Sequence, residues 1–342
     1  MKEVGYQRNS YFDFLRGLAI MMVVGIHTWP AQNGYQLDGS FMEVLQLLMK
    51  NFFNCAVPLF LAISGYFIGR KNLVSFAECR TFWRKQIPTV YIPCLIFSIP
   101  WFVISCMSVN IFFEGRVIFK LLNLFFCGYS VYYFIALIIE CYVLTPILLK
   151  YNNIKGLIVV VIISCATSML QEYVRFYGGI DLPLIVYGSF PPVLIFYFLG
   201  IYFSRRLRSY SLWLPATLIA VGFVCGILHM QFLRSNLGIQ GDGQKLSLYL
   251  FDAGIILLCL SERVEKWYRD NRFTRVVLYV GVISFGIYFT HVYLIFIISR
   301  LAPQLRNSWL LMWLLSILLT IAFIAGVKRV IPVYARRYLG YR

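Results

Sequence analysis

The sequence predicts an all-α fold, a polytopic membrane helix bundle of about ten transmembrane helices. Of the 342 residues, 60% are hydrophobic and only 13% are charged, and the mean hydropathy is +0.75. Because about 20 consecutive apolar residues cross a bilayer as a helix, apolar runs of this length are candidate spans. They lie at 12–29, 44–68, 88–108, 130–149, 155–171, 183–203, 211–231, 246–261, 276–299 and 309–331.

Two of these spans are weaker than the others. The sixth contains Pro191-Pro192, which predicts a short helix with a broken start, and the eighth is short with Asp252 at its middle. A further apolar stretch at 116–127 is too short to cross, so we expect it to lie in the interface or to re-enter. The chain shows no internal repeat and no soluble segment, so we expect one integral-membrane domain over residues 1–342.

The basic residues orient the chain in the membrane. If the N-terminus is cytoplasmic, most of the 31 Lys and Arg residues fall in cytoplasmic segments, as the positive-inside rule requires. With an even number of spans, the chain ends on the side of the membrane where it begins, so we expect both termini to be cytoplasmic. The net charge of +17 follows from this topology, and we expect no nucleic-acid partner.

The first span carries Asp13, Arg16 and His27, the most informative polar residues of the chain. An ionisable side chain in the bilayer costs about 3 kcal/mol, so it is retained mostly where it has a function. The step from Arg16 to His27 rotates by about 1100°, within about 20° of three full turns, so both lie on one face, roughly 16 Å apart. This pattern favours an anion held at Arg16 and proton chemistry at His27.

Simpler interpretations of these residues stay open. His27 could pack beside Trp29 at the interface, and Arg16 could be an anchor whose charged end reaches the membrane surface. Asp13 lies about 21 Å from His27 along a straight helix, too far to orient that imidazole. A salt bridge from Asp13 to Arg16, three residues later, is therefore the expected pairing.

Later spans also contain ionisable side chains. Glu140 lies in the middle of the fourth span, where a carboxylate is either a catalytic candidate or the structural partner of a buried cation. Asp252 has the same two interpretations, with structural pairing favoured. His291, in the outer half of the ninth span, could contact an acceptor or simply pack. His229 is expected to lie at the interface.

A second basic cluster follows the second span. As a group these residues are either a positive-inside signal or a docking site for a phosphorylated cofactor, because Arg grips phosphates bidentately. They are Arg70, Lys71, Arg80, Arg84 and Lys85. Just before them, Pro58, Ser64 and Gly65 would let the backbone approach a ligand or another helix closely.

Six segments, in order along the chain, resemble the membrane-bound acyltransferase 3 family, whose members O-acylate surface glycans and other cell-envelope molecules. The first is similar to the family's D-x-L-R-G-hydrophobic-H signature. The segments are FDFLRGLAIMMVVGIHTW (12–29), VPLFLAISGYFIG (57–69), FWRKQIPTVYIP (82–93), YYFIALIIECYVLTPIL (132–148), FYFLGIYF (196–203) and ISFGIYFTH (283–291). The chain is most similar to short, stand-alone members that acetylate lipid-linked or exported polysaccharide precursors.

The resemblance implies His27 as the catalytic residue, with Arg16, Arg80 and Arg84 as the family's conserved basic positions. It also implies a bacterial cytoplasmic (inner) membrane enzyme, acetyl-CoA as the acyl donor and no metal. We therefore expect His27 to deprotonate an acceptor hydroxyl that attacks the thioester, or to relay the acetyl group itself. The acceptor is expected to be a glycan or a lipid-linked sugar.

The sequence thus assigns roles to ten residues. The catalytic residues are His27 and Glu140. The donor-binding residues are Arg16, Arg80, Arg84, Ser64 and Tyr66. The acceptor-binding residues are Asp13, Tyr133 and His291. Besides membrane lipid, the expected partners are a second copy of the chain or a polysaccharide-synthesis complex.

Two other classes of protein stay open. In a transporter or flippase, Arg16, Glu140 and Asp252 would line a substrate path. The sequence shows neither an inverted repeat nor paired broken helices, which are common in transporters. A membrane scaffold for a polysaccharide synthase is the second alternative, and it would tolerate the loss of His27 and Arg16.

Overall fold

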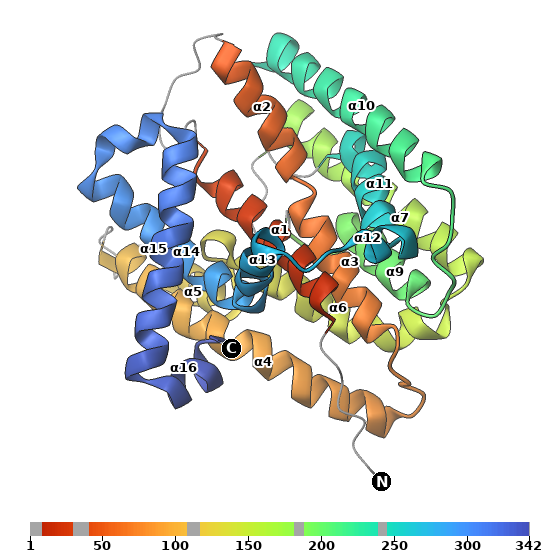
Figure 1. Cartoon of the computed structure of the whole chain (residues 1–342), viewed down its shortest axis with the longest axis horizontal. Helices are drawn as coiled ribbons and strands as arrows, with labels where there is room; N and C mark the ends of the chain where they lie inside the picture. The colour runs from red at the N-terminus through yellow and green to blue at the C-terminus, as the bar shows by residue number, and fades with distance from the viewer. Residues whose placement is uncertain (1–8, 30–40, 108–116, 181–187, 239–244, 342) are drawn as a thin grey trace.

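The computed structural model describes residues 9–29, 41–107, 117–180, 188–238 and 245–341. Every regular element in these ranges is a helix (Figure 1). The α-helices are α1 (Ser10–His27), α2 (Phe41–Phe53), α3 (Ala56–Ile68), α4 (Phe76–Met107), α5 (Val117–Phe125), α6 (Tyr133–Lys150), α7 (Ile154–Glu172), α9 (Leu194–Phe203), α10 (Trp213–Leu237), α11 (Tyr249–Leu260), α12 (Glu262–Trp267), α13 (Arg272–Val282), α14 (Ser284–Leu301), α15 (Trp309–Val330) and α16 (Pro332–Tyr338).

The predicted all-α membrane bundle is confirmed. Within the described ranges, eight helical stretches are long and apolar enough to cross a membrane. They are Ser10–His27, Leu47–Ile68, Phe76–Met107, Ser130–Lys150, Ile154–Tyr177, Trp213–Leu237, Ser284–Leu301 and Trp309–Val330. The two weak spans appear as shorter apolar helices, Pro191–Phe203 and Leu246–Leu260. Residues 183–187 of the predicted sixth span lie outside the described residues.

The third and ninth spans differ from the prediction. α4 begins at Phe76, well before residue 88, because its polar first half continues the same helix despite internal prolines at 88, 93 and 100. The predicted ninth span, 276–299, is two helices that break at Ile283, the C-cap of α13 and the N-cap of α14. Within the short stretch at 116–127, Val117–Phe125 forms α5, which lies against α4, where the Tyr91 hydroxyl donates to the Phe125 carbonyl at 2.8 Å.

α1 lies in the middle of the bundle, with α14 and α15 on one side and α10 and α11 on the other (Figure 1). Its first half crosses α13 at very short range. A Cβ at Gly281 would meet the Asp13 carbonyl oxygen at 1.7 Å, and one at Gly17 would meet the Val277 carbonyl oxygen at 2.0 Å. Glycine on both helices permits this approach, as at many membrane helix crossings. The crossing fixes the half of α1 that carries Asp13 and Arg16.

α3 and α9 form a second close crossing. A Cβ at Gly65 would lie 2.1 Å from the Tyr197 carbonyl oxygen, and one at Gly200 would lie 2.0 Å from the Ala62 carbonyl oxygen. Gly65 is therefore a packing residue, which is the structural alternative considered for the 57–69 segment. Ser64, next to it in the sequence, is half-buried on α3.

The second half of α1 is held by two tryptophans of α15. The indole nitrogen of Trp309 donates to the Gly25 carbonyl at 2.8 Å, and that of Trp313 donates to the Met21 carbonyl at 2.7 Å. At the end of α1, the Thr28 hydroxyl donates to the Val24 carbonyl at 3.1 Å. These bonds hold the second half of α1, and with it the backbone that carries His27, against α15.

Candidate active site

Two cavities meet at His27. The larger has a volume of about 770 Å³ and is lined by residues of α1, α3, α4, α6, α13 and α14, and by the segment that follows α3. The smaller has a volume of about 250 Å³ and is lined by residues of α1, α2, α3, α6 and α7, together with residues just before α9. The residues that line both are Val23, His27, Val57 and Tyr133.

The larger cavity has a basic mouth and an ion pair within it. Arg70 and Lys71, both exposed, line it at the surface. Further in, Arg16 donates to the Asp13 carboxylate at 2.9 Å, as the spacing of these two residues predicted. The Asp13 side chain is only 2% exposed, whereas that of Arg16 is 33% exposed. A cation thus remains accessible from the cavity while its carboxylate partner is buried.

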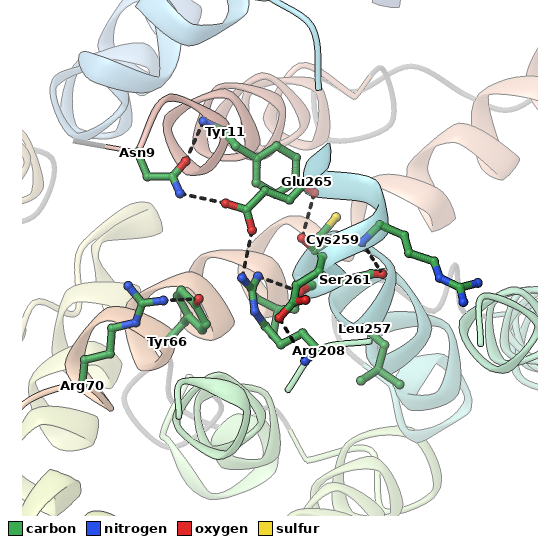
Figure 2. A network of polar contacts seen from close by, with 12 residues as sticks. Asn9, Tyr11, Tyr66, Arg70, Arg208, Leu257, Cys259, Ser261 and Glu265 are labelled. Atoms are coloured by element: carbon green, nitrogen blue, oxygen red, sulfur yellow. Dashed lines mark hydrogen bonds and ion pairs between the residues drawn. The ribbon is translucent and has the colours of Figure 1, made fainter. Parts of the chain in front are cut away.

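A polar network fixes the mouth (Figure 2). The Arg70 guanidinium donates to the Tyr66 hydroxyl, and the guanidinium carbons of Arg70 and Arg208 lie 4.4 and 5.1 Å from the Tyr66 ring centroid. Arg208 also pairs with Glu265 at 2.9 Å, and the same Glu265 side chain accepts from Asn9 at 2.9 Å. Tyr66 itself is 1% exposed and does not line the cavity, so it orients Arg70 without facing the cavity.

His27 lies beside His291. The two ring centroids are 5.4 Å apart with an interplanar angle of 39°. His291 Nδ1 lies 2.9 Å from the Ile287 carbonyl oxygen, so Nδ1 donates this hydrogen bond. His291 is fully buried and lines neither cavity, so the structure does not place it against an acceptor as the sequence predicted.

Tyr133 lies at the junction of the cavities because the turn before it is bonded to α14. The Tyr132 hydroxyl donates to the Phe289 carbonyl at 2.9 Å, and the Tyr288 hydroxyl donates to the Val131 carbonyl at 2.5 Å. Two bonds running in opposite directions between the same segments leave this turn little freedom. Ser64 lines the larger cavity, so the structure brings Asp13, Arg16, Ser64, Tyr133 and His27 together.

The smaller cavity is lined by polar residues that the sequence analysis did not single out. Lys50 is 7% exposed, and its ammonium lies 4.9 Å from the Trp29 ring centroid. Glu172 Oε1 accepts from the Leu246 amide at 2.5 Å and from the Ser168 hydroxyl at 3.3 Å. Arg175 lines the same cavity. These residues come from different helices and match no local motif, so only the packing brings them together.

Four other predicted residues lie away from both cavities. Arg80 and Arg84 are exposed on α4. Glu140 is half-buried, and its carboxylate accepts from the Phe190 amide at 2.9 Å, just before the Pro191-Pro192 break. This contact favours the structural interpretation of Glu140. Asp252 is fully buried on α11.

No group of three or more His, Cys, Asp or Glu side chains in the described part of the chain is arranged to hold a metal ion. The site offers a cavity that extends from the cations at its mouth to the imidazole of His27, and a second cavity beyond the imidazole that is lined by both apolar and polar side chains. Such an arrangement suits a reaction between two substrates that enter from different sides.

A family model described as an acyltransferase domain matches residues 9–329, a range that includes every residue lining either cavity. The chain belongs to the acyltransferase 3 family. It is therefore a multi-pass membrane acyltransferase. Searches of the curated proteins and of the solved structures found no match.

Proposed function

We propose that this acyltransferase moves an acetyl group from cytosolic acetyl-CoA to a hydroxyl of a cell-envelope glycan or its lipid-linked precursor, with His27 as the general base. The observation that carries the proposal is that His27 lines both cavities where they meet. A donor in the larger cavity and an acceptor in the smaller one would reach the same imidazole from two sides.

The larger cavity suits the donor. Its basic residues Arg70, Lys71 and Arg16 match the phosphates of coenzyme A, because charge-assisted bonds to phosphate are strong. The rise along α1 from Arg16 to His27 is roughly 16 Å, of the same order as the extended pantetheine arm. With both termini in the cytoplasm of a bacterial inner membrane, the basic mouth faces the cytosol, where acetyl-CoA is made.

The smaller cavity suits a polyhydroxylated acceptor. Its lining combines the donors Lys50 and Arg175 with the acceptor Glu172 and further amide and hydroxyl side chains. A sugar presents both donors and acceptors, so a lining of mixed type can bind its hydroxyl groups and fix its orientation. The residues shared with the larger cavity would then bring one acceptor hydroxyl next to His27.

The chemistry requires one proton carrier. The unprotonated ring nitrogen of His27 takes the proton of the acceptor hydroxyl while the oxygen attacks the thioester carbonyl carbon. When the carbon–sulfur bond breaks, the imidazolium returns this proton to the departing thiolate, giving an ester, a thiol and neutral His27. In the relay variant, His27 attacks the thioester first, and the departing thiolate takes the imidazole proton to leave as the thiol. The acceptor hydroxyl then attacks the acetyl-imidazole, and its proton goes to the imidazole nitrogen that is released.

The geometry gives no support to a transport path. Glu140 and Asp252, which would line such a path with Arg16, line neither cavity. The acyltransferase 3 membership of the chain independently supports group transfer.

The proposal is tested by measuring acetyl transfer in three membrane preparations. They contain the wild-type protein, the His27→Gln variant or the His229→Gln variant. His229 is a half-buried histidine that pairs with Ser247 at 3.0 Å and lines neither cavity, so it is the matched control. With radiolabelled acetyl-CoA, we expect label in the glycan fraction for wild type and His229→Gln only. Wild-type transfer by a normally folded His27→Gln protein would refute the role of His27.

A further inference from the structure

We infer that His291 is a positioning residue whose Nε2 accepts a hydrogen bond from a ring N–H of His27. A neutral histidine, in place of the more familiar carboxylate, would then orient the catalytic imidazole. The inference rests on the proposed function of His27 and names a further residue that acts through it.

The protonation of His291 follows from its partner. A backbone carbonyl oxygen only accepts hydrogen bonds, so Nδ1, at 2.9 Å from the Ile287 oxygen, must carry a hydrogen. A neutral imidazole has one N–H, which leaves the lone pair on Nε2. The cationic form would place a second N–H and a full charge in a site with no exposure to solvent, which is costly.

The lone pair of Nε2 is buried. Nε2 has no hydrogen-bond partner among the described residues, and the side chain has 0% exposure. An unsatisfied buried acceptor costs about 1–3 kcal/mol, so such an atom normally has a partner in the working state. Because His291 lines neither cavity, the side chains packed against it are the candidates for that partner.

Among the described residues, two aromatic rings lie beside His291. Tyr288 is 6.3 Å away between centroids, but its hydroxyl already donates to the Val131 carbonyl at 2.5 Å. His27, at 5.4 Å, is closer and has a ring N–H to donate. Histidine χ2 occupies a broad well, so the His27 ring can turn a nitrogen towards Nε2 while His291 keeps its bond to Ile287.

This bond would assist catalysis in two ways. With its N–H directed to His291, neutral His27 keeps its other nitrogen unprotonated as the base. When His27 takes the acceptor's proton, the bond to Nε2 becomes charge-assisted and stronger, so it stabilises the transition state more than the ground state. Asp13 cannot serve this purpose, because it lies about 21 Å from His27 along α1.

The kinetic test compares His291→Leu, which removes the acceptor, with His291→Gln, which keeps an amide oxygen. We expect His291→Leu to lower kcat by about 10²-fold with an unchanged KM for acetyl-CoA. The kcat of His291→Gln should be at least tenfold higher than that of His291→Leu. His229→Leu should have the kcat of the wild-type protein. Equal kcat values for the Leu and Gln variants, or wild-type kcat in His291→Leu, would overturn the inference.

A spectroscopic test is independent of acyl transfer. The chain has three histidines, so ¹⁵N-histidine labelling in a His229→Gln background leaves only His27 and His291. We expect Nδ1–H for His291 and a single hydrogen-bonded tautomer for His27 that is lost in His291→Leu. Identical His27 ring nitrogen signals with and without His291 would refute the bond. If the wild-type protein shows the bond but no transfer, the proposed function fails while the pairing stands.

Discussion

Arg16 and His27 line the same cavity from one helix, roughly 16 Å apart along the axis of α1. The residue proposed to bind the donor's anionic part and the residue proposed for the chemistry are thus fixed relative to each other by a single rigid element. Binding and chemistry should therefore be separable by mutation, because a change at Arg16 leaves the backbone at His27 in place.

The first prediction concerns Arg16. Arg16→Gln should raise the KM for acetyl-CoA by about tenfold, the equivalent of about 1.4 kcal/mol of lost binding, with little change in kcat. Steady-state kinetics in membranes measure both. The variant should also lose thermal stability, because it removes the cation bonded to the buried Asp13 carboxylate.

The double variant Asp13→Asn/Arg16→Gln separates these two effects. It replaces the ion pair by two neutral amides, so we expect the melting temperature to recover while the KM stays high. Recovery of both quantities would show that Arg16 serves only the stability of the bundle.

The second prediction contrasts two basic pairs. Arg70 and Lys71 line the mouth of the larger cavity, whereas Arg80 and Arg84 are exposed on α4 and line neither cavity. Arg70→Gln/Lys71→Gln should raise the KM for acetyl-CoA by about tenfold and reduce its dependence on salt. Arg80→Gln/Arg84→Gln should change the KM by less than about twofold. The reverse result would favour the assignment made from the family resemblance.

The third prediction concerns the crossing of α1 and α13. Gly281→Ala would place a Cβ 1.7 Å from the Asp13 carbonyl oxygen, so the helices must separate. We expect a loss of about 1–3 kcal/mol in stability and a raised KM for the donor, because Arg16 moves with α1. Gly326→Ala is the control, because a Cβ at Gly326 meets nothing within 4 Å. Thermal unfolding in detergent should show a lower midpoint for Gly281→Ala alone.

The sequence predicted the parts of the site that lie on one helix. Arg16 and His27 share a face because helical periodicity is local, and the Asp13–Arg16 pair follows from a spacing of three residues. The smaller cavity was not predictable in this way. Lys50 and Glu172 belong to α2 and α7, and only the packing of these helices brings them to one cavity.

The errors in the predicted boundaries of the third and ninth spans also have a physical cause. Counting apolar runs ignores polar stretches that continue a helix, so it begins the third span at residue 88 and leaves out the first half of α4. The same method cannot detect a break within an apolar run, so it places Ile283 inside the span 276–299. Both errors concern residues that line the larger cavity, since Gln86 lies on the first half of α4 and Gly281 and Val282 lie beside the break at Ile283.

The last prediction tests the junction of the cavities. Val57 lines both, and Val57→Phe adds a ring where the acetyl group would pass from donor to acceptor. We expect transfer to fall more than tenfold, while binding of coenzyme A, which is held at the basic mouth, falls much less. Transfer of labelled acetyl and binding of labelled coenzyme A, both in membranes, measure the two quantities.

The control for Val57→Phe is the same substitution on the outer face of the bundle. Val143 on α6 is 50% exposed and lines neither cavity, so Val143→Phe should leave transfer and stability unchanged. Overpacking at Val57 costs about 1–3 kcal/mol, so the melting temperature of both variants is measured alongside. If Val57→Phe folds and transfers acetyl as fast as Val143→Phe, the acetyl group does not pass through this junction, and His27 would receive donor and acceptor by another route.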